Sequence, residues 1–322
     1  MSHRDIADRP RIGVSACLLG NEVRFDGGHK RDAFLMDILG PHVEWVPVCP
    51  EVEVGMGTPR ETLRLVDEGT GSLRMVTTRS GKDYTPGMTA WARTRLEELA
   101  KENLSGYVLK KDSPSCGLER VKVFGVEGMP ARTGRGIFAA SLLARFPCLP
   151  VEEEGRLNDA RLRENFIERV FAYGRLQRLF APRWTAGALV AFHTAHKMTL
   201  LAHSEEAYRR LGRIVAAAGR LPRQALRREY EREFMRALEV VATPRRHTNV
   251  LTHMAGHLKT RLDAGSRHEL MATIDDYRRG LVPLVVPLTL LRHHVRVHGV
   301  EYLQGQTYLE PHPRELMLRN HV

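Results

Sequence analysis

Arg11-Ile12-Gly13-Val14-Ser15-Ala16 is a short apolar segment that leads directly into a cysteine. Two later segments repeat this arrangement. The three pairs of segment and cysteine are 11–16 with Cys17, 42–48 with Cys49, and 106–110 with Cys116 a few residues later. Short apolar runs bounded by Gly, Pro and Ser are typical of buried strands. The sequence therefore predicts three strands, each followed by a cysteine.

Helical patterns lie between and after these segments. Trp91, Leu96 and Leu99 recur at roughly helical spacing in residues 89–103, and a glycine-rich turn precedes a second helix at residues 137–145. Strands that alternate with helices are typical of a parallel sheet. The carboxyl ends of parallel strands share one edge, where ligands bind. We therefore expect a Rossmann-like α/β domain with the three cysteines together at that edge.

A change of pattern near residue 150 divides the chain. Pro147 and Pro150 precede the acidic run at residues 152–154, which is the composition of a boundary. We therefore expect one domain at residues 1–152 and a second at residues 153–322. The second domain should be all-α, because its apolar residues recur with a helical period. Its expected helices span residues 157–179, 186–218, 223–242, 249–262 and 288–297.

The composition is that of an ordinary soluble protein, with 43% hydrophobic and 27% charged residues. No apolar run approaches the roughly 18 residues that a membrane span needs. Residues 1–11 are polar and lack the apolar core of a secretory signal. We therefore expect a cytoplasmic protein without membrane contact, and no obligate protein partner is evident.

The net charge of +11 is concentrated in the second half of the chain. Residues 1–150 contain 21 Lys and Arg against 19 Asp and Glu, a balance of +2, whereas residues 151–322 contain 28 against 19, a balance of +9. A basic domain beside a near-neutral one suggests that the second domain meets a polyanion. The alternative is that its arginines only form solvated helix faces.

Arginines recur along the expected helix 223–242 at positions that include i,i+4 neighbours. They are Arg223, Arg227, Arg228, Arg232 and Arg236. Arginine binds RNA phosphates and stacks on unpaired bases, so Arg223, Arg227 and Arg228 are candidate RNA-binding residues. The competing interpretation is that glutamates of the same helix pair with them.

Four cysteines are too few for a disulfide scaffold, which leaves metal binding, catalysis or burial as their roles. Cys148 lies in an apolar segment, and we interpret it as a buried structural thiol. Three thiolates can hold a [4Fe–4S] cluster with one iron open to a substrate atom. Zinc sites usually contain a closely spaced cysteine pair, which this chain lacks. Spacing alone leaves open a cluster, a structural metal and unrelated core residues.

Three blocks of sequence around these cysteines resemble the thiouracil desulfidase family. They are VSACLLG and RFDGG at residues 14–20 and 24–28, VPVCPE and TPR at residues 46–51 and 58–60, and LKKDSPSCG at residues 109–117. The blocks occur in the order of the family and span residues 12 to about 150. Each block alone is a modest signal, but the three together are specific.

The second domain resembles another family, the YbgA-type domain. The matching residues are FHTAHK at 192–197, AHS at 202–204, LGR at 211–213, YRRG at 277–280 and QTY at 306–308. The fusion of the two domains resembles the bacterial tRNA 4-thiouridine desulfidases. The resemblance therefore covers nearly the whole chain.

This resemblance implies a [4Fe–4S] cluster on Cys17, Cys49 and Cys116. It also implies a non-redox desulfidase that converts 4-thiouridine in tRNA to uridine and releases sulfide, with tRNA as the partner. By the same motif match, Glu51 and Ser113 occupy the catalytic positions. Glu51 suits a general base for the attacking water, and Ser113 suits a proton relay or a water-orienting hydroxyl, with Ser115 the weaker candidate for that role.

Other interpretations remain open from the residues alone. Glu51 could instead be a carboxylate that stabilises the start of a helix, and Ser113 could be a hydroxyl that caps a helix or forms a turn. The same chemistry on free thiouracil or 4-thio-UMP is one alternative function, and a non-enzymatic metal- and RNA-binding protein is another. Lys110, Lys111 and Arg60 are candidates for contact with a substrate phosphate, or they face solvent instead.

Overall fold

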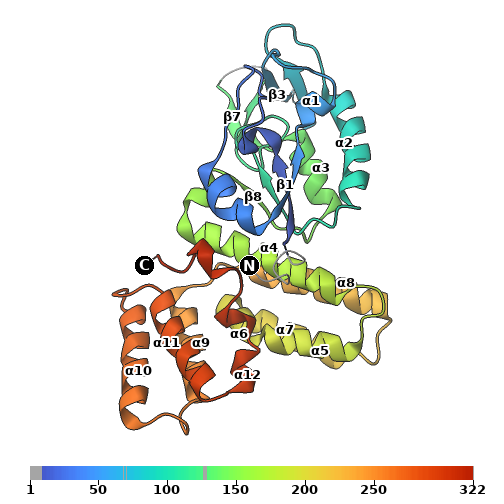
Figure 1. Ribbon diagram of the computed structural model, residues 1–322. Helices are drawn as coiled ribbons and strands as arrows, with labels where there is room; N and C mark the ends of the chain where they lie inside the picture. Colours follow the sequence, from blue (N-terminus) through green and yellow to red (C-terminus); the bar gives the residue numbers. More distant parts are fainter. Residues whose placement is uncertain (1–8, 68, 70, 126–128, 322) are drawn as a thin grey trace. The chain divides into compact units, whose positions relative to one another are not determined.

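The computed structural model describes residues 9–67, 69, 71–125 and 129–321. Most of the polar start discussed above, residues 1–8, lies outside the described part. The chain folds as two compact units, Met1–Asp159 and Ala160–Val322, and each has its own core (Figure 1).

The first unit contains a four-stranded sheet in which every neighbouring pair of strands is parallel. In spatial order its strands are β2 (Glu44–Val48), β1 (Arg11–Ser15), β5 (Gly106–Leu109) and β8 (Val151–Glu153). The three strands expected from the sequence are β1, β2 and β5, so the predicted parallel α/β fold is confirmed. The acidic run at 152–154 belongs mostly to β8, which completes the sheet.

Gly13 lets the two central strands pack together. A side chain at Gly13 would collide with the ring of Tyr107 on β5, its partner in the strand register. The Tyr107 ring is fully buried and lies 6.0 Å from the ring of Phe138, measured between centroids. The small residue in β1 therefore leaves room for a large aromatic residue in the core beside it.

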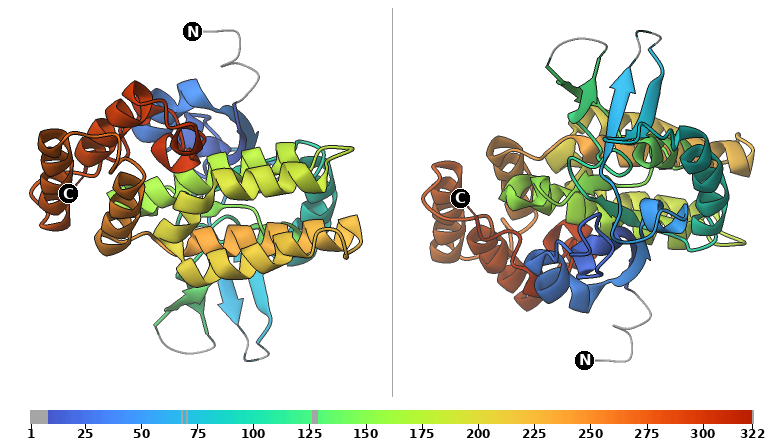
Figure 2. Two further views of the ribbon diagram at one scale, coloured as in Figure 1. Left: turned by 90° about the horizontal axis from the view of Figure 1, so that it is seen from below. Right: turned by 90° about the horizontal axis from the view of Figure 1, so that it is seen from above.

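A second, mixed sheet was not predicted from the sequence. Its strands, in spatial order, are β4 (Leu73–Thr77), β3 (Leu63–Asp67), β6 (Val121–Phe124) and β7 (Ala131–Gly134). β3 pairs with β4 and β6 pairs with β7 in antiparallel fashion, whereas β3 and β6 are parallel. These strands project together at one end of the unit (Figure 2, right). A basic residue interrupts each of them (Arg64, Arg74, Lys122 and Arg132), so no continuous apolar run marks them.

Two longer helices cover the parallel sheet, α2 (Thr85–Leu99) and α3 (Ile137–Arg145). They pack against each other, and Trp91 of α2 lies 5.4 Å from Phe138 of α3 between ring centroids. The expected helix 137–145 is found with the same limits, and the one expected at 89–103 begins and ends four residues earlier. A short helix, α1 (Pro50–Glu53), follows β2.

The second unit is helical throughout its regular structure, as predicted. Its helices are α4 (Ala160–Leu179), α5 (Ala186–Ala195), α6 (Lys197–His203), α7 (Glu205–Ala216), α8 (Arg223–Glu239), α9 (Pro244–Gly256), α10 (Ala264–Arg278), α11 (Val285–Val297) and α12 (Glu301–Gln304). The prediction of one long helix at 186–218 is wrong, because three helices occupy this stretch. Ser204 caps the third of them by accepting a hydrogen bond from the Ala207 N–H.

These helices form two groups within the second unit. α8 packs against α4 and α7, and α7 also packs against α5 (Figure 2, left). α9, α10 and α11 pack together around a separate apolar core that includes Leu251, Met254 and Leu291. Within the described part of the chain, none of the helices combines the length and apolarity that crossing a bilayer requires.

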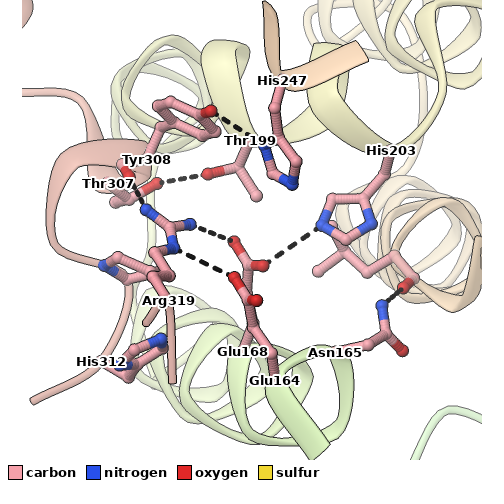
Figure 3. Close-up of polar contacts among 12 residues, drawn as sticks. Glu164, Asn165, Glu168, Thr199, His203, His247, Thr307, Tyr308, His312 and Arg319 are labelled. Carbon is pink, nitrogen blue, oxygen red and sulfur yellow. Dashed lines mark hydrogen bonds and ion pairs between the residues drawn. The ribbon is translucent and has the colours of Figure 1, made fainter. Parts of the chain in front are cut away.

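A buried ionic cluster ties the last residues of the described chain to α4 (Figure 3). The Arg319 Nε donates to Glu164 Oε1 at 3.1 Å, and the Arg319 Nη2 lies 3.7 Å from Glu168 Oε1. On the other side of Glu168, Oε2 lies 3.3 Å from His203 Nε2. Burial opposes ionisation of Glu168, but His203 and Arg319 together hold its pKa below the ordinary value.

We expect Arg319→Ala to destabilise the second unit strongly, because it leaves two glutamates buried without their cation. Breaking a buried ion pair from one side costs about 3 to 5 kcal/mol. Thermal unfolding followed by helical circular dichroism should show a clearly lower Tm. Arg314→Ala, at an exposed arginine five residues earlier, is the matched control and should leave the Tm nearly unchanged. Equal Tm values for the two variants would contradict a stabilising role for Arg319.

Candidate functional site

Three cysteines lie at the carboxyl edge of the parallel sheet, as the sequence predicts. Cys17 lies in the 3₁₀-helix η1 (Ala16–Leu19) that follows β1, Cys49 is the N-cap of α1 after β2, and Cys116 lies in the loop after β5. All three line one cavity of about 400 Å³. Cys17 and Cys116 are buried, and Cys49 is half-buried.

The start of α3 fixes the loop that carries Cys116. The backbone N–H groups of Gly136, Ile137 and Ala139 donate to the carbonyl oxygens of Gly117, Pro114 and Ser115, at 2.7, 3.1 and 3.1 Å respectively. N–H groups of the first helical turn have no partner within their own helix, and here the loop supplies one for each. The cysteine loop is therefore held by three backbone hydrogen bonds from the start of α3.

Glu51 lies at the centre of the polar groups in the cavity. Its Oε1 accepts hydrogen bonds from the hydroxyls of Ser115 at 2.5 Å and Ser113 at 3.4 Å. Its Oε2 lies 3.6 Å from the Cys49 Sγ. Ser113 and Ser115 also contact each other, with 2.9 Å between their hydroxyl oxygens. The structure thus brings together the two predicted catalytic residues, Glu51 and Ser113.

The two serines have different surroundings. Ser113 lines the cavity, and its hydroxyl oxygen accepts hydrogen bonds from the N–H groups of Cys116 at 3.1 Å and Ser115 at 3.3 Å. Ser115 is fully buried and also lies 3.5 Å from the Cys116 Sγ. Ser115 therefore connects Glu51 to a cysteine loop, whereas Ser113 is the serine that a ligand in the cavity can reach.

Arg60 and Lys110, which the sequence offered to a phosphate, are held by the protein. The Arg60 guanidinium donates to the carbonyl oxygens of Val23 at 2.9 Å and Gly57 at 3.0 Å. The Lys110 ammonium forms an ion pair with Glu154 at 2.5 Å. Both side chains therefore organise the walls of the cavity, and a phosphate would have to compete with these contacts.

The buried environment keeps the cysteines protonated. Burial raises the pKa of the Cys17 thiol to about 11 and that of the Cys49 thiol to about 12, and the nearby Glu51 carboxylate adds to both shifts. The pKa of Cys116 is raised well above its ordinary value for the same two reasons. Iron binds the thiolate, so occupation by a metal group would release protons from these thiols.

The donor set fits the [4Fe–4S] cluster that the sequence implies. The three candidate ligands in the cavity are all cysteine sulfurs, from Cys17, Cys49 and Cys116. Iron–sulfur clusters are held by cysteine thiolates. Within the described ranges, no three His, Cys, Asp or Glu side chains lie close enough to hold a single metal ion together. The three thiols border a space of about 400 Å³, as ligands to a group of several atoms would.

Cys148 lies apart from the cavity, since it follows α3 and is absent from the lining residues. Its side chain is half-buried, whereas the sequence predicted a buried thiol, so that prediction overstates its burial. The segment that carries Cys148 forms a turn before it enters β8 at the end of the first unit.

The candidate RNA-binding arginines all lie on α8, but they do not share one environment. The guanidinium of Arg223 lies 4.9 Å from the ring centroid of Trp184. That of Arg227 lies 5.4 Å from the ring centroid of Phe180 and pairs with Glu231 at 3.8 Å. Arg228 is exposed, and so are the arginines that follow it at i+4 and i+8, Arg232 and Arg236. These three form the outward-facing row of the helix.

Two histidines of the second unit that the sequence places close together, His193 and His196, serve packing. His193 Nδ1 lies 3.2 Å from the Tyr230 hydroxyl, and its ring stacks on Tyr208 with 5.3 Å between centroids. His196 ends α5, and its ring stacks on Phe192 at 4.0 Å. Burial lowers the pKa of His196 to about 3, so this side chain is neutral at physiological pH.

Sequence reasoning missed two residues that build the site. Glu154 accepts from the Lys111 N–H at 2.8 Å in addition to pairing with Lys110, so it fixes the chain just after β5. Gly136 permits the close approach of α3 to the Cys116 loop. Neither carries a motif of its own, because each acts through a contact with a segment distant in the sequence.

We expect Gly136→Ala to disrupt the site although it alters no ligand. An added Cβ would collide with the Ser115 carbonyl oxygen and lie 2.8 Å from the Cys116 nitrogen, both backbone atoms. Iron content after anaerobic reconstitution should fall well below that of the wild type. Gly87→Ala on α2 is the matched control, since its Cβ would meet only Val54 Cγ2 at 3.7 Å. Full iron loading of Gly136→Ala would contradict this account of the loop.

Two family profiles match the chain, one in each unit. The family described as 2-thiouracil desulfurase matches residues 12–154, and the family described as a protein of unknown function, DUF1722, matches residues 197–313. The first match contains every residue of the candidate site. It confirms the expected enzyme class of the first unit, a desulfurase.

Proteins similar to the two halves are also known. Uncharacterized protein YbgA of Escherichia coli K12 is 36% identical over 165 residues, which cover 51% of this chain and 98% of that protein. Uncharacterized protein YbbK of Bacillus subtilis 168 is 33% identical over 153 residues, which cover 46% of this chain and 98% of that protein.

Among solved structures, a [4Fe–4S]-dependent thiouracil desulfidase is 32% identical, covering 49% of this chain and 100% of that one, with a TM-score of 0.40. From the family profiles and the two relatives, the first half of the chain belongs to the 2-thiouracil desulfurase family and the second half to the YbgA-type DUF1722 family.

Proposed function

We propose that this protein is a [4Fe–4S]-dependent desulfidase that acts on 4-thiouridine in tRNA. The reaction is hydrolysis: water adds its oxygen at C4 of the pyrimidine, the carbon–sulfur bond breaks, and uridine and sulfide are the products. No net electron transfer is needed. The observation that carries this proposal is the cavity that three cysteines and the Glu51 carboxylate line together.

Cys17, Cys49 and Cys116 would hold the cluster. When bound by three thiolates, such a cluster supplies a Lewis-acidic iron with an open position, which suits a soft thiocarbonyl sulfur. The remaining chemistry falls to the side chains of the chain itself, which must orient the substrate and move protons.

Glu51 is the residue best placed to take a proton from water in the cavity. Its carboxylate lines the cavity and is oriented from two sides, by the Ser115 hydroxyl at 2.5 Å and by the Arg60 guanidinium at 3.9 Å. A general base must be within hydrogen-bond reach of the proton that it removes, and a fixed carboxylate meets this need best. The contacts thus support catalysis over the simpler role of a helix-start carboxylate.

Ser113 can return the proton. Two backbone N–H groups occupy its oxygen as acceptor, so its own hydrogen is directed toward Glu51 or the hydroxyl of Ser115. A path Ser113–Ser115–Glu51 follows, with oxygen separations of 2.9 and 2.5 Å. We assign Ser113 to proton transfer with the pyrimidine and Ser115 to holding Glu51 in place.

The second unit supplies RNA binding in this proposal. The charge balance of +9 over residues 151–322 supports this role, as does the row of exposed arginines Arg228, Arg232 and Arg236 on α8. Arg223 and Arg227 flank this row, where Trp184 and Phe180 support their guanidinium groups. Such supported guanidinium groups are well ordered for contact with phosphates or bases.

We infer a cytoplasmic location for the same protein. Cysteines that hold an iron–sulfur cluster must not be oxidised to disulfides, and the reducing cytoplasm keeps cysteines in that state. The proposed substrate, tRNA, is also found there.

We expect ligand and base substitutions to separate cluster loading from turnover. Cys17→Ala, Cys49→Ala and Cys116→Ala should each abolish iron binding and sulfide release, because each removes a ligand. Glu51→Gln should keep the visible absorbance of the cluster but lose turnover by a factor of about 10² to 10⁴, the usual contribution of a general base. Iron content, visible absorbance and sulfide release from 4-thiouridine measure these effects.

Cys148→Ala is the matched control for the cysteine series and should retain both iron and activity. Loss of the cluster in Cys148→Ala would overturn three-cysteine ligation, and near-normal turnover in Glu51→Gln would remove Glu51 as the base.

We expect the triple change Arg228→Gln, Arg232→Gln and Arg236→Gln to weaken tRNA binding and make it less sensitive to salt. Removing one phosphate contact should reduce the slope of log affinity against log salt by roughly 0.7 to 0.9. Filter binding of tRNA across a salt series measures both quantities. Turnover of 4-thiouridine 5′-monophosphate should be unchanged, because this substrate needs only the cavity of the first unit.

A triple variant of equal charge on the first unit provides the control: Arg79→Gln, Arg93→Gln and Lys101→Gln, all at exposed positions. Equal weakening in both triple variants would mean that overall charge and not α8 governs binding. Unchanged tRNA affinity in the α8 variant would reject the assignment of this helix and favour the free nucleotide as substrate.

A further inference from the structure

One exposed aromatic side chain stands at the cavity of the first unit. Among the described residues that line this cavity, Phe25 carries the only aromatic ring. Its side chain is 40% exposed, although large apolar side chains are normally buried. Because the ring lies at the wall of the cavity and is partly exposed, it offers an apolar face that a ligand in the cavity can contact.

The loop that carries Phe25 is built rigidly. The Arg24 N–H donates to the Gly28 carbonyl oxygen at 3.2 Å, and the Gly27 N–H donates to the Arg24 carbonyl oxygen at 3.0 Å. Gly27 has a φ of +79°, a conformation that glycine adopts without strain. These contacts close a tight turn, so the ring is presented from an ordered loop.

Arg60 connects this loop to the catalytic carboxylate. The Arg60 N–H donates to the Phe25 carbonyl oxygen at 2.8 Å, and the Arg60 guanidinium lies 3.9 Å from Glu51 Oε2. The position of the ring and the position of the proposed base are therefore set by the same residue. A substrate in contact with Phe25 would lie at a defined position relative to Glu51.

The surroundings of the ring suit a flat, polar heterocycle. The Arg24 guanidinium lies 5.2 Å from the ring centroid of Phe25, and the exposed part of the ring leaves area for a second planar group. Pyrimidines stack on aromatic side chains in this way. Attack by water on the C4 carbon proceeds perpendicular to the plane of the heterocycle, so a contact that fixes this plane favours the reaction.

We propose that Phe25 is the stacking platform for the thiolated pyrimidine and thereby helps to set the substrate class of the site. This inference rests on the proposed function, because it assigns a binding residue within the same cavity. It predicts that affinity depends on an aromatic ring at position 25, whereas the chemical step depends on Glu51.

The test compares Phe25→Leu, which keeps an apolar side chain without a ring, with Phe25→Tyr, which keeps the ring. Phe25→Leu should raise the KM for 4-thiouridine 5′-monophosphate about tenfold, within the range that base stacking supplies, and leave kcat within about twofold of the wild type. Phe25→Tyr should retain a KM close to that of the wild type. Ile38→Ala, which removes a 44% exposed apolar side chain away from the cavity, should change neither constant.

A second measurement is independent of turnover. Calorimetric titration of the cluster-free protein with uridine 5′-monophosphate reports stacking alone, and Phe25→Leu should lower this affinity by about the same factor. If the wild-type protein releases no sulfide, the proposed function fails, but the titration still decides on Phe25. Unchanged KM and unchanged affinity in Phe25→Leu would overturn the inference, and so would an equal loss in Phe25→Leu and Phe25→Tyr.

Discussion

The parallel pairing of β1 with both β2 and β5 is the constraint on which the site depends. Because parallel strands end at the same edge, the residues that follow them meet although they lie far apart in sequence. Cys17, Cys49 and Cys116 reach one cavity because they follow neighbouring parallel strands, and α3 then fixes the longer loop that carries Cys116. The pairing itself requires Gly13, since any larger residue there would exclude the buried ring of Tyr107. Core packing in two strands thus sets the position of groups at their ends.

Glu51 couples the parts of the site electrostatically. Burial is the main cause of the raised thiol pKa of Cys17, Cys49 and Cys116, and the Glu51 carboxylate adds to all three shifts. The same carboxylate accepts hydrogen bonds from the hydroxyls of Ser113 and Ser115. One side chain therefore acts on all three thiols and on both serines.

The sequence predicted those features that have a local signature. Apolar runs marked β1, β2 and β5, and helical periodicity marked α3 and most of the second unit. The mixed sheet was missed because a basic residue interrupts each of its strands. The division of residues 186–218 was missed because the sequence does not distinguish the cap at Ser204 from a serine within a helix. Motifs identified Glu51 and the cysteines, but the role of Gly136 exists only through its contact with a distant loop.

The two units differ in how late in the sequence the last residues that complete their buried contacts occur. The parallel sheet is complete at β8, Val151–Glu153, so the first unit can fold while the rest of the chain is still being made. In the second unit, Glu164 and Glu168 near its beginning find their cation at Arg319 near its end. During synthesis, more than one hundred residues must leave the ribosome after Glu164 and Glu168 before Arg319 can pair with them. Burying α4 before then would leave its carboxylates without this cation, which is unfavourable.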